Sequence, residues 1–356
     1  MVYMQKQLIA MCEEFITKLE KQNTLSKEEY LYLIQNRESC KALLYEKARK
    51  ICNKIYGNKI YIRGLIEFTN ICKNNCYYCG IRRGNSNCQR YRLTKEQIIE
   101  CADEGYHLGF RTFVLQGGED SFFTDEILCD IVQSLKENYS DCAITLSVGE
   151  RSFESYQKLK EAGADRYLLR HETANPEHYK KLHPAEMNFN NRIQCLYHLK
   201  KLGYQIGAGF MVGSPYQTEE DLANEMLFLK NLNPQMVGIG PFICHKDTPF
   251  LKEPSGSVEL TLFMLGLIRL TLPKVLLPAT TALGTLDELG REKGIKAGAN
   301  VLMPNLSPVN VRKKYMLYDN KICTGDESAK CIECLKTRIK ATGCEIVTGR
   351  GDSLNI

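Results

Sequence analysis

From about residue 60 onward, the chain of 356 residues alternates short apolar runs with amphipathic stretches. The apolar runs are strand-like, whereas stretches such as 94–110 and 152–164 carry apolar positions at helical spacing and end near glycine. Eight strands are predicted, over residues 60–68, 112–116, 143–147, 166–170, 205–211, 236–240, 274–279 and 299–303. Such strand–helix units build parallel sheets, and eight of them close naturally into a (β/α)8 (TIM) barrel, an α/β fold.

Segments of different character flank the predicted barrel. The first is helical: Ser26 and Glu29 are placed to form a capping box, and Gly57 is placed to end the last helix. The last is irregular and carries its own cysteine group. We therefore predict a helical extension over 1–57, the barrel over 58–304 and a C-terminal segment over 305–356.

Composition and charge narrow the class of protein. Apolar residues make up 44% and charged residues 25%, which is ordinary for a globular chain with a large core. The net charge of +5 is spread among acidic residues, so neither nucleic acid nor a membrane surface is an expected partner. The apolar window 260–273 is shorter than the roughly 20 residues that span a bilayer, and it contains Arg269, so a buried helix is expected.

Cysteine usage points to metal chemistry. We find no export signal at the N-terminus and expect a cytoplasmic protein. Sixteen cysteines in a large chain of that kind indicate metal binding and reduced thiols, in reducing or anaerobic surroundings.

Cys72, Cys76 and Cys79 follow the first predicted strand with the spacing C-x3-C-x2-C. Three thiolates can hold three irons of a four-iron cluster and leave the fourth iron open to a small molecule. The alternatives are a zinc site or unliganded thiols, but zinc would require a fourth ligand and no histidine lies nearby in the sequence.

Polar residues recur where predicted strands end, which is where barrel enzymes assemble their sites. The sequence QGGE (Gln116 to Glu119) follows the second strand, and Arg166, Arg170 and Glu172 lie at even spacing on the fourth. Buried guanidinium and carboxylate groups need partners, so either a zwitterionic or anionic ligand or a structural salt-bridge network is expected. Thr280 and Thr281 either line a pocket or cap the next helix.

The cysteine spacing, with Tyr78 before the last cysteine, resembles the radical S-adenosylmethionine (radical SAM) superfamily. This resemblance implies a 4Fe–4S cluster whose open iron binds the methionine half of SAM. One electron then cleaves SAM to methionine and a 5′-deoxyadenosyl radical. The resemblance also implies that the GGE motif meets the methionine amino group.

Further segments, among them YCGIRR, LQGGED, RYLLRHETANP, GAGFMVGSPYQT and MVGIGPFICHKDTP, together resemble the HydE-type FeFe-hydrogenase maturases. That family is related to biotin synthase and 3-methylornithine synthase, and the likeness runs from about 60 to 335. It implies action on a precursor of the hydrogenase diiron subcluster, a cysteine-bound iron with carbon monoxide and cyanide. Partner maturases and a low-potential electron donor are implied as well.

The resemblance also assigns roles to residues. The cluster ligands are Cys72, Cys76 and Cys79. Cofactor contacts are assigned to Tyr78, Gln116, Gly117, Gly118, Glu119, Ser147, Glu172, Arg192 and Met211, and Gly117 stands where some relatives carry serine. The substrate cavity is assigned to Thr145, Arg166, Arg170, Thr280, Thr281, Met303 and Tyr315.

A second group, Cys323, Cys331 and Cys334, has the spacing C-x7-C-x2-C. The resemblance implies an accessory iron–sulfur cluster here, 2Fe–2S or 4Fe–4S, at the surface and dispensable for turnover. A zinc site completed by Cys344, or spare thiols, is the alternative. Other cysteines, including Cys12, Cys129 and Cys195, are expected to pack in the core.

Two other functions stay open from the sequence. The first is a radical enzyme of the biotin-synthase or methylornithine-synthase kind, acting on an organic substrate. Biotin synthase holds an extra cluster deep in its barrel, and no cysteine lies in the third to fifth predicted strands. The second is a non-catalytic iron–sulfur scaffold, which leaves the strand-end glycines, arginines and glutamates unexplained.

Overall fold

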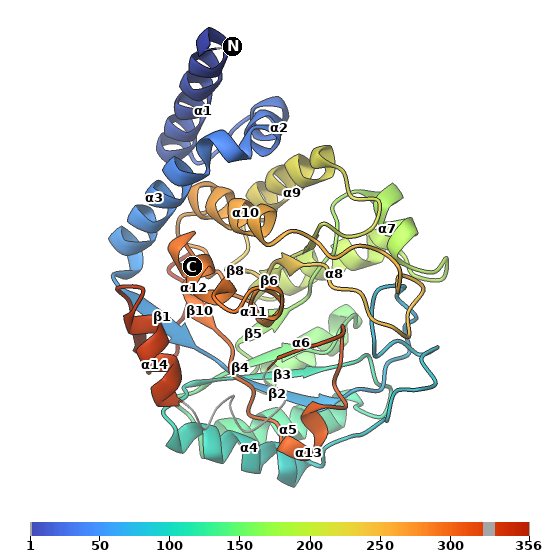
Figure 1. Ribbon diagram of the computed structural model, residues 1–356. Coiled ribbons are helices and arrows are strands. Elements are labelled where there is room, and N and C mark those ends of the chain that lie inside the picture. The colour runs from blue at the N-terminus through green and yellow to red at the C-terminus, as the bar shows by residue number, and fades with distance from the viewer. Residues whose placement is uncertain (1, 323–331, 356) are drawn as a thin grey trace.

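Parallel strands form the inner wall of the molecule and helices form its outer layer (Figure 1). The computed structural model describes residues 2–322 and 332–355. The main sheet has six parallel strands in the order β2-β3-β4-β5-β6-β8. The strands are β1 Lys59–Ile62, β2 Gly64–Thr69, β3 Thr112–Gly117, β4 Ala143–Ser147, β5 Arg166–Leu168, β6 Gln205–Ala208, β7 Met211–Val212, β8 Met236–Val237, β9 Gly240–Pro241, β10 Val301–Leu302 and β11 Glu345–Val347.

Isolated bridges close this sheet into a ring. Met236 of β8 bridges to Leu276, and Pro278 bridges to Val301 of β10, which pairs with β1. Leu65 of β2 bridges to Asn305 on the other side of the gap. The fold is therefore TIM-barrel-like, which confirms the predicted fold class.

Individual strands differ from the prediction in ways that have local causes. The stretch 60–68 divides into β1 and β2 at Arg63, so that one half pairs with β10 and the other with β3. The stretch 274–279 contributes only isolated bridges at Leu276 and Pro278. Pro278 has no N–H to donate, so a continuous hydrogen-bonded ladder cannot pass through it.

Helices cover the outside of the ring and extend it at one end. They are α1 Val2–Gln22, α2 Lys27–Gln35, α3 Arg37–Tyr56, α4 Lys95–His107, α5 Asp125–Asn138, α6 Phe153–Glu161, α7 Pro176–Leu182, α8 Phe189–Lys201, α9 Glu219–Leu232, α10 Val258–Thr271, α11 Thr281–Leu286, α12 Gly290–Lys296, α13 Val309–Arg312 and α14 Ile332–Lys340. The first three project from the top of the barrel in Figure 1, where α2 packs on α9 and α3 packs on α10. The predicted capping box of Ser26 and Glu29 is present, and Gly57 ends α3 with φ 64°.

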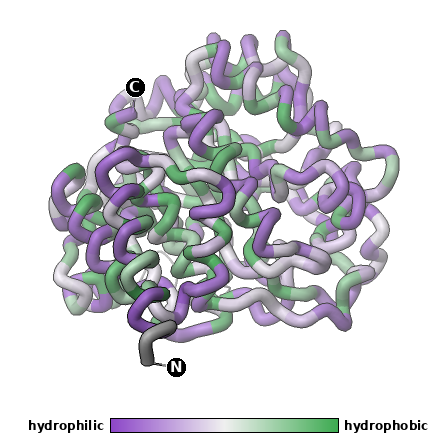
Figure 2. Tube along the Cα trace, turned by 90° about the horizontal axis from the view of Figure 1, so that it is seen from above, coloured by the Kyte–Doolittle hydropathy of each residue, from purple (hydrophilic) through white to green (hydrophobic). Residues whose placement is uncertain are grey.

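Helix α10 is buried from Thr261 to Thr271, because α1, α3, α9 and α12 pack around it. Its Arg269 is fully buried, and the guanidinium donates to the carbonyl oxygens of Gly298, Pro273 and Val275 and to the Asn300 side chain. The expected buried helix is confirmed. Elsewhere on the outer layer, hydrophilic and hydrophobic stretches alternate along the trace (Figure 2). Within the described ranges, every helix is too short or too polar to cross a bilayer.

The C-terminal residues pack against the amino-terminal end of the barrel strands. Strand β11 extends the sheet beside β1, in parallel. Beyond it, Asp352 lies 2.7 Å from the Arg166 guanidinium and Arg350 lies 3.0 Å from Asp165. These contacts show that residues from 345 onward pair with the barrel strands or form ion pairs with them. The division of the chain into three parts stays a prediction.

Candidate active site

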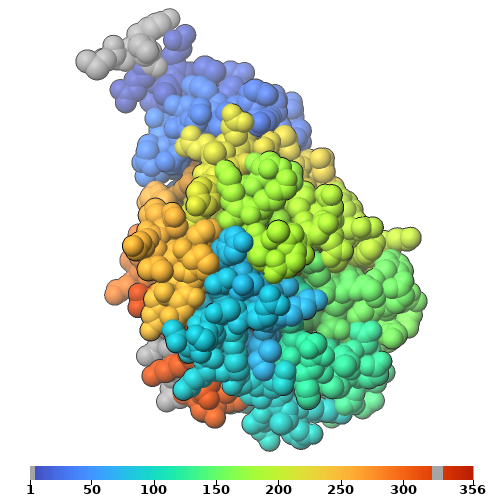
Figure 3. All heavy atoms as spheres, turned by 90° about the vertical axis from the view of Figure 1, so that its right-hand side faces the viewer, coloured from blue at the N-terminus to red at the C-terminus, as the bar shows by residue number. Residues whose placement is uncertain are grey.

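The three-cysteine loop follows β2 and has almost no regular secondary structure. Side chain to backbone hydrogen bonds hold it in place. Asn70 Nδ2 donates to Gln89 O (2.8 Å) and Lys314 O (2.7 Å), and Arg90 Nη1 donates to Asn70 O and Ile81 O. Figure 3 shows the blue-to-cyan segment of this loop at the surface, between the yellow-green and orange segments.

Cys72, Cys76 and Cys79 line the same cavity and interact electrostatically with one another. Burial raises the pKa of all three thiols, to about 12 for Cys76, and the neighbouring thiols raise the pKa of Cys79 further. Backbone N–H groups, among them that of Glu119 at 3.4 Å from Cys72 Sγ, oppose the rise for Cys72. Iron would displace these protons, because the thiolate is the form that binds metal.

The GGE turn at the end of β3 packs directly against the cysteine loop. A Cβ atom at Gly118 would lie 2.2 Å from Ile71 O and 2.8 Å from Cys72 Cβ, so only glycine fits between them. The Glu119 carboxylate accepts the Glu150 N–H at 3.0 Å and lies 3.3 Å from Lys73 Nζ. This turn therefore brings an anchored carboxylate next to the cysteines.

Arg192 of α8 supplies a buried cation beside that carboxylate. Its guanidinium lies 2.8 Å from Glu150 Oε1 and 3.8 Å from Glu119 Oε1. Burial alone would lower the pKa of Arg192, but the two carboxylates outweigh burial and raise the pKa well above its ordinary value. The contact to Glu150 lacks hydrogen-bond geometry, so Arg192 Nε has no hydrogen-bond partner among the described residues. Arg192 therefore brings a buried positive charge, ion-paired with Glu150, to the cavity wall.

Arg170 and Glu172 face the cavity from the loop after β5. Arg170 Nη2 lies 3.1 Å from Glu172 Oε2, but without hydrogen-bond geometry, and neither atom has a hydrogen-bond partner in the described part of the chain. Glu172 has the left-handed φ of 67°, which is strained for a residue with a Cβ. Polar atoms without hydrogen-bond partners, next to a strained backbone in a cavity, indicate a ligand contact.

These groups line a cavity of about 370 Å³ at the carboxyl ends of the strands, a size that accommodates a small molecule. All predicted cluster, cofactor and cavity residues except Thr145 and Arg166 line it: Cys72, Cys76, Tyr78, Cys79, Gln116, Gly117, Gly118, Glu119, Ser147, Arg170, Glu172, Arg192, Met211, Thr280, Thr281, Met303 and Tyr315. Thr280 does not cap α11 through its side chain, and its buried Oγ1 has no hydrogen-bond partner among the described groups. Thr280 therefore lines the cavity and makes no capping bond to the helix.

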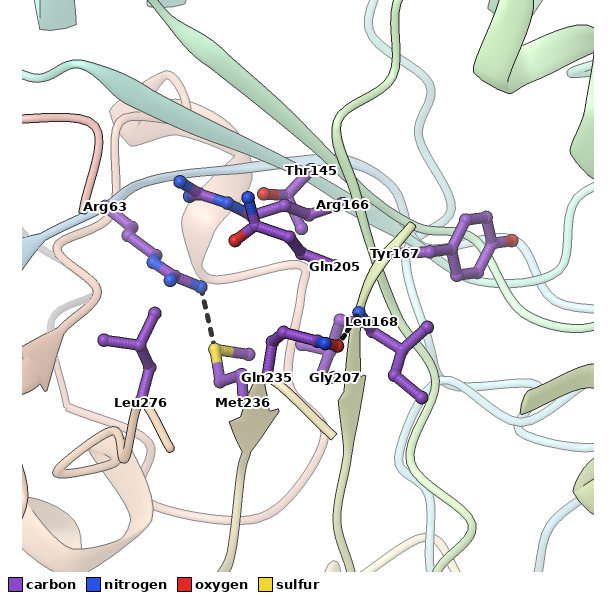
Figure 4. Close-up of a pocket in the computed structure, with 11 residues that line it drawn as sticks. Arg63, Thr145, Arg166, Tyr167, Leu168, Gln205, Gly207, Gln235, Met236 and Leu276 are labelled. Atoms are coloured by element: carbon purple, nitrogen blue, oxygen red, sulfur yellow. Dashed lines mark hydrogen bonds between the residues drawn. The ribbon is translucent and has the colours of Figure 1, made fainter. Parts of the chain in front are cut away.

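Thr145 and Arg166 lie elsewhere, in a cavity of about 10 Å³ that holds roughly one water molecule (Figure 4). The prediction put Arg166 at a strand end, but β5 begins at Arg166, and the side chain bonds Thr112 and Asp352 at the amino-terminal end. Arg63 faces the same small cavity and donates to Met236 Sδ at 2.8 Å. Leu168 and Met236 line both cavities and separate them. The substrate-lining role of Thr145 and Arg166 stays a prediction without a direct contact to the larger cavity.

A buried ion pair in the cavity wall was not among the residues predicted from the sequence. Lys321 Nζ lies 2.5 Å from Glu67 Oε1, and Asn305 Nδ2 donates to Glu67 Oε2 at 2.8 Å. Glu67 and Lys321 both line the larger cavity. A glutamate inside an apolar strand run is a signal for Glu67, whereas Lys321 follows an irregular segment and carries no such signal.

The accessory cysteines lie at the edge of the described chain. Cys323 and Cys331 fall outside the described residues, and Cys334 lies in α14. Cys344 is buried. The accessory cluster therefore stays a prediction. Cys12 and Cys195 pack in the core and Cys129 packs against it, as expected.

A barrel that presents three clustered cysteines and an adjacent GGE turn at its strand ends defines a radical SAM protein. In agreement, the Radical SAM superfamily model matches residues 66–229. The chain is 46% identical to the FeFe-hydrogenase maturase subunit HydE of Thermotoga maritima over 330 residues. The aligned residues make up 93% of this chain and 94% of that protein. The chain belongs to the HydE family.

More distant relatives share the fold and much of the length. The 3-methylornithine synthase of Methanosarcina acetivorans is 30% identical over 306 residues, 85% of this chain and 84% of that protein. The crystal structure of methylornithine synthase (PylB) superposes with a TM-score of 0.81 at 26% identity and covers 94% of this chain and 97% of that one. The chain is therefore a radical SAM enzyme, and its family implies a 4Fe–4S cluster and SAM as cofactors.

Proposed function

We propose that this enzyme acts in assembly of the FeFe-hydrogenase active site, on a cysteine-bound iron that carries carbon monoxide and cyanide. The likeness to HydE of Thermotoga maritima over nearly the whole chain supports this role. The structural observation that carries it is the three-cysteine loop, which lines a cavity in which Arg170 and Glu172 have polar atoms without hydrogen-bond partners.

The residues present fit the cofactors of the family. Cys72, Cys76 and Cys79 would hold three irons of the cluster, because all three line one cavity and their buried thiols interact electrostatically. When bound, the reduced cluster supplies one electron that splits SAM into methionine and a 5′-deoxyadenosyl radical. Arg192 would offer its positive charge to the methionine carboxylate, and Glu119 would offer its carboxylate to the amino group.

The other residues that line the cavity would orient the substrate and exclude water. Arg170 and Thr280 supply polar atoms, whereas Met303 and Phe242 are among the apolar residues that face the space between them. Tyr315 is 2% exposed, and its hydroxyl accepts a hydrogen bond from Gln116 Nε2 at 3.3 Å. The apolar residues of this wall would help to keep water away from the reacting groups.

We also propose partner proteins for this reaction, as the likeness to HydE implies. Other hydrogenase maturases would deliver and receive the iron-containing substrate, and a low-potential donor would supply the electron. The proposed site of action is the cytoplasm. The accessory cluster at Cys323, Cys331 and Cys334 remains part of this proposal as a surface site that turnover does not need.

Anaerobic reconstitution tests the proposal. The native chain and a Cys76→Ala variant are loaded with iron and sulfide, reduced with dithionite and given SAM, and 5′-deoxyadenosine is measured. We expect deoxyadenosine from the native chain and none from the variant, with circular dichroism confirming that both are folded. A native protein with a complete four-iron cluster and no deoxyadenosine would favour the iron–sulfur scaffold.

A methylornithine-synthase-like reaction on an organic amino acid is the second candidate, because that enzyme shares the fold over most of both chains. In the same assay, an iron–cysteine carbonyl cyanide compound should increase deoxyadenosine formation and lysine should not. Stimulation by lysine alone would select the second candidate. A biotin-synthase-like reaction is less well supported, because among the described cysteines only Cys72, Cys76 and Cys79 line the cavity.

A further inference from the structure

A fully buried histidine–glutamate pair lies behind the cavity, between the loop after β5 and helix α9. His171 Nε2 lies 2.7 Å from Glu225 Oε2, and both side chains are 0% exposed. Neither residue lines the cavity. The reaction as described above uses neither residue, although a buried carboxylate has a large desolvation cost that other contacts must offset.

The hydrogen bonds define one consistent proton arrangement for the pair. The Gly209 N–H donates to His171 Nδ1 at 3.3 Å, so Nδ1 carries no proton and Nε2 donates to Glu225. The second oxygen of Glu225 accepts the Ala174 N–H at 2.5 Å. The carboxylate thus uses one oxygen for the imidazole and the other for the backbone.

These bonds enclose Glu172, the strained residue that faces the cavity. Glu172 lies between His171 and Ala174, and its N–H donates to Gly209 O at 3.0 Å. It also forms a parallel bridge with Phe210, just before Met211. His171 therefore joins the exits of β5 and β6 to each other, and Glu225 joins both exits to α9. A left-handed backbone persists only where its surroundings hold it in this way.

We infer that Glu225 and His171 are positioning residues that aim the Glu172 carboxylate at SAM. This inference rests on the proposed cofactor contact of Glu172. The pair touches no ligand itself and acts through the backbone on either side of Glu172. Residues that do not touch a ligand themselves can still fix the orientation of a neighbouring side chain that binds it.

The substitution Glu225→Gln tests the hydrogen bonds of the carboxylate separately from packing, because it keeps the size and shape of the side chain. An amide has one oxygen, so its NH2 group must face either the Ala174 N–H or His171. If His171 changes tautomer to accept from the amide, its Nδ1–H then faces the Gly209 N–H. Every arrangement leaves two donors facing each other, and the loop that carries Glu172 must shift.

The experiment measures SAM affinity rather than turnover. Native protein, Glu225→Gln, Glu172→Gln and the double variant are reconstituted anaerobically, and their dissociation constants for SAM are determined by equilibrium dialysis with the cluster oxidised. We expect each single variant to bind SAM about 10- to 100-fold more weakly, the usual range for lost outer-layer partners. Because Glu225 acts through Glu172, the double variant should bind no more weakly than Glu172→Gln alone.

Controls separate positioning from general destabilisation. Tyr30→Phe removes a buried hydrogen bond to Thr271, between α2 and α10, and should leave SAM affinity unchanged. Iron content and melting temperature are measured for every variant. His171→Gln serves if Glu225→Gln does not fold, since it keeps a donor for Glu225 but loses the acceptor for Gly209; it should also weaken SAM binding.

The SAM affinities of the variants distinguish a failure of the positioning role from a failure of the proposed cofactor contact. Native SAM affinity in a folded Glu225→Gln or His171→Gln protein, with Glu172→Gln weakened, would overturn the positioning role and leave the proposed function intact. Strictly additive losses in the double variant would also overturn it, because they would show that Glu225 acts independently of Glu172. Native affinity in Glu172→Gln would remove the cofactor contact on which the inference rests.

Discussion

At the scale of single residues, His183 shows how burial selects one protonation state beside the cysteine loop. Its side chain donates from Nδ1 to Tyr179 O at 3.0 Å, so Nε2 must accept from the Tyr78 hydroxyl at 3.1 Å. Burial lowers the pKa of His183 to about 3, more than the bond to Tyr179 O raises it. The imidazole therefore stays neutral in the folded protein and orients the aromatic residue of the cysteine motif.

This shift predicts a pH-dependent stability. Below an unfolded pKa of about 6.5, the unfolded chain binds a proton at His183 that the folded chain does not, so the free energy of unfolding falls as pH decreases. The contribution is about 1.4 kcal/mol per pH unit between roughly 6.5 and 3. His183→Gln should show a shallower decrease, measured by anaerobic urea unfolding at about pH 7 and about pH 5.5. Equal slopes for the two proteins would contradict the assignment.

At the same scale, the sequence predicted which residues belong to the site more reliably than it predicted where their side chains lie. The cysteines, the GGE turn and Glu172 were found from motif and strand-end position and Arg192 from the family resemblance, and the structure brings them to one cavity. Arg166 was misplaced because even spacing along a strand does not reveal which end of the strand a residue occupies. His171 and Glu225 carried no signal, since their pairing joins positions 54 residues apart.

At the scale of elements, the fit between the GGE turn and the cysteine loop is close. The Gly118 position lies against Ile71 O and Cys72 Cβ. Both elements follow neighbouring parallel strands, β2 and β3, so their carboxyl ends meet at the same edge of the sheet. Sequence alone places each element but does not reveal the contact between them.

We predict that Gly118→Ala displaces the cysteine loop. The added Cβ would force Ile71 O or Cys72 to move, at a cost typical of overpacking, about 1–3 kcal/mol. The variant should remain folded and incorporate much less iron than the native chain on reconstitution, measured as iron and sulfide per chain. Gly349→Ala is the matched control because no atom lies within 4 Å of its added Cβ. Full iron loading of Gly118→Ala would contradict the prediction.

At the scale of the whole molecule, the end of the chain closes the amino-terminal side of the barrel. Asp352 accepts from the guanidinium groups of Arg166 and Arg350 and from Gln205. Burial alone would raise the pKa of Asp352, but these bonds outweigh burial and lower it strongly. These bonds thus connect β5 and β6 to a segment that lies 186 and 147 residues later in the chain.

A lowered pKa in the folded state means that the Asp352 carboxylate contributes stability above its unfolded pKa of about 3.9 and loses it as pH falls further. Asp352→Asn should therefore lower the melting temperature at neutral pH by about 2–4 °C, with the two proteins converging below about pH 4. Asp130→Asn is the control, because Asp130 pairs with Lys95 at the surface, where ion pairs contribute little. A constant difference at all pH values would contradict the assignment.

Local patterns were sufficient for much of this protein. Periodicity of apolar residues predicted the barrel and most of its helices, because burial of one face requires that pattern in any sequence that folds this way. The cysteine spacing predicted the cluster site, because one loop supplies all three ligands. Tertiary structure alone decided which strand end each polar residue faces, how isolated bridges close the ring, and which distant side chains hold Glu172, Arg166 and Glu67. These features depend on hydrogen bonds and charges between residues far apart in the chain, and no local pattern records such pairings.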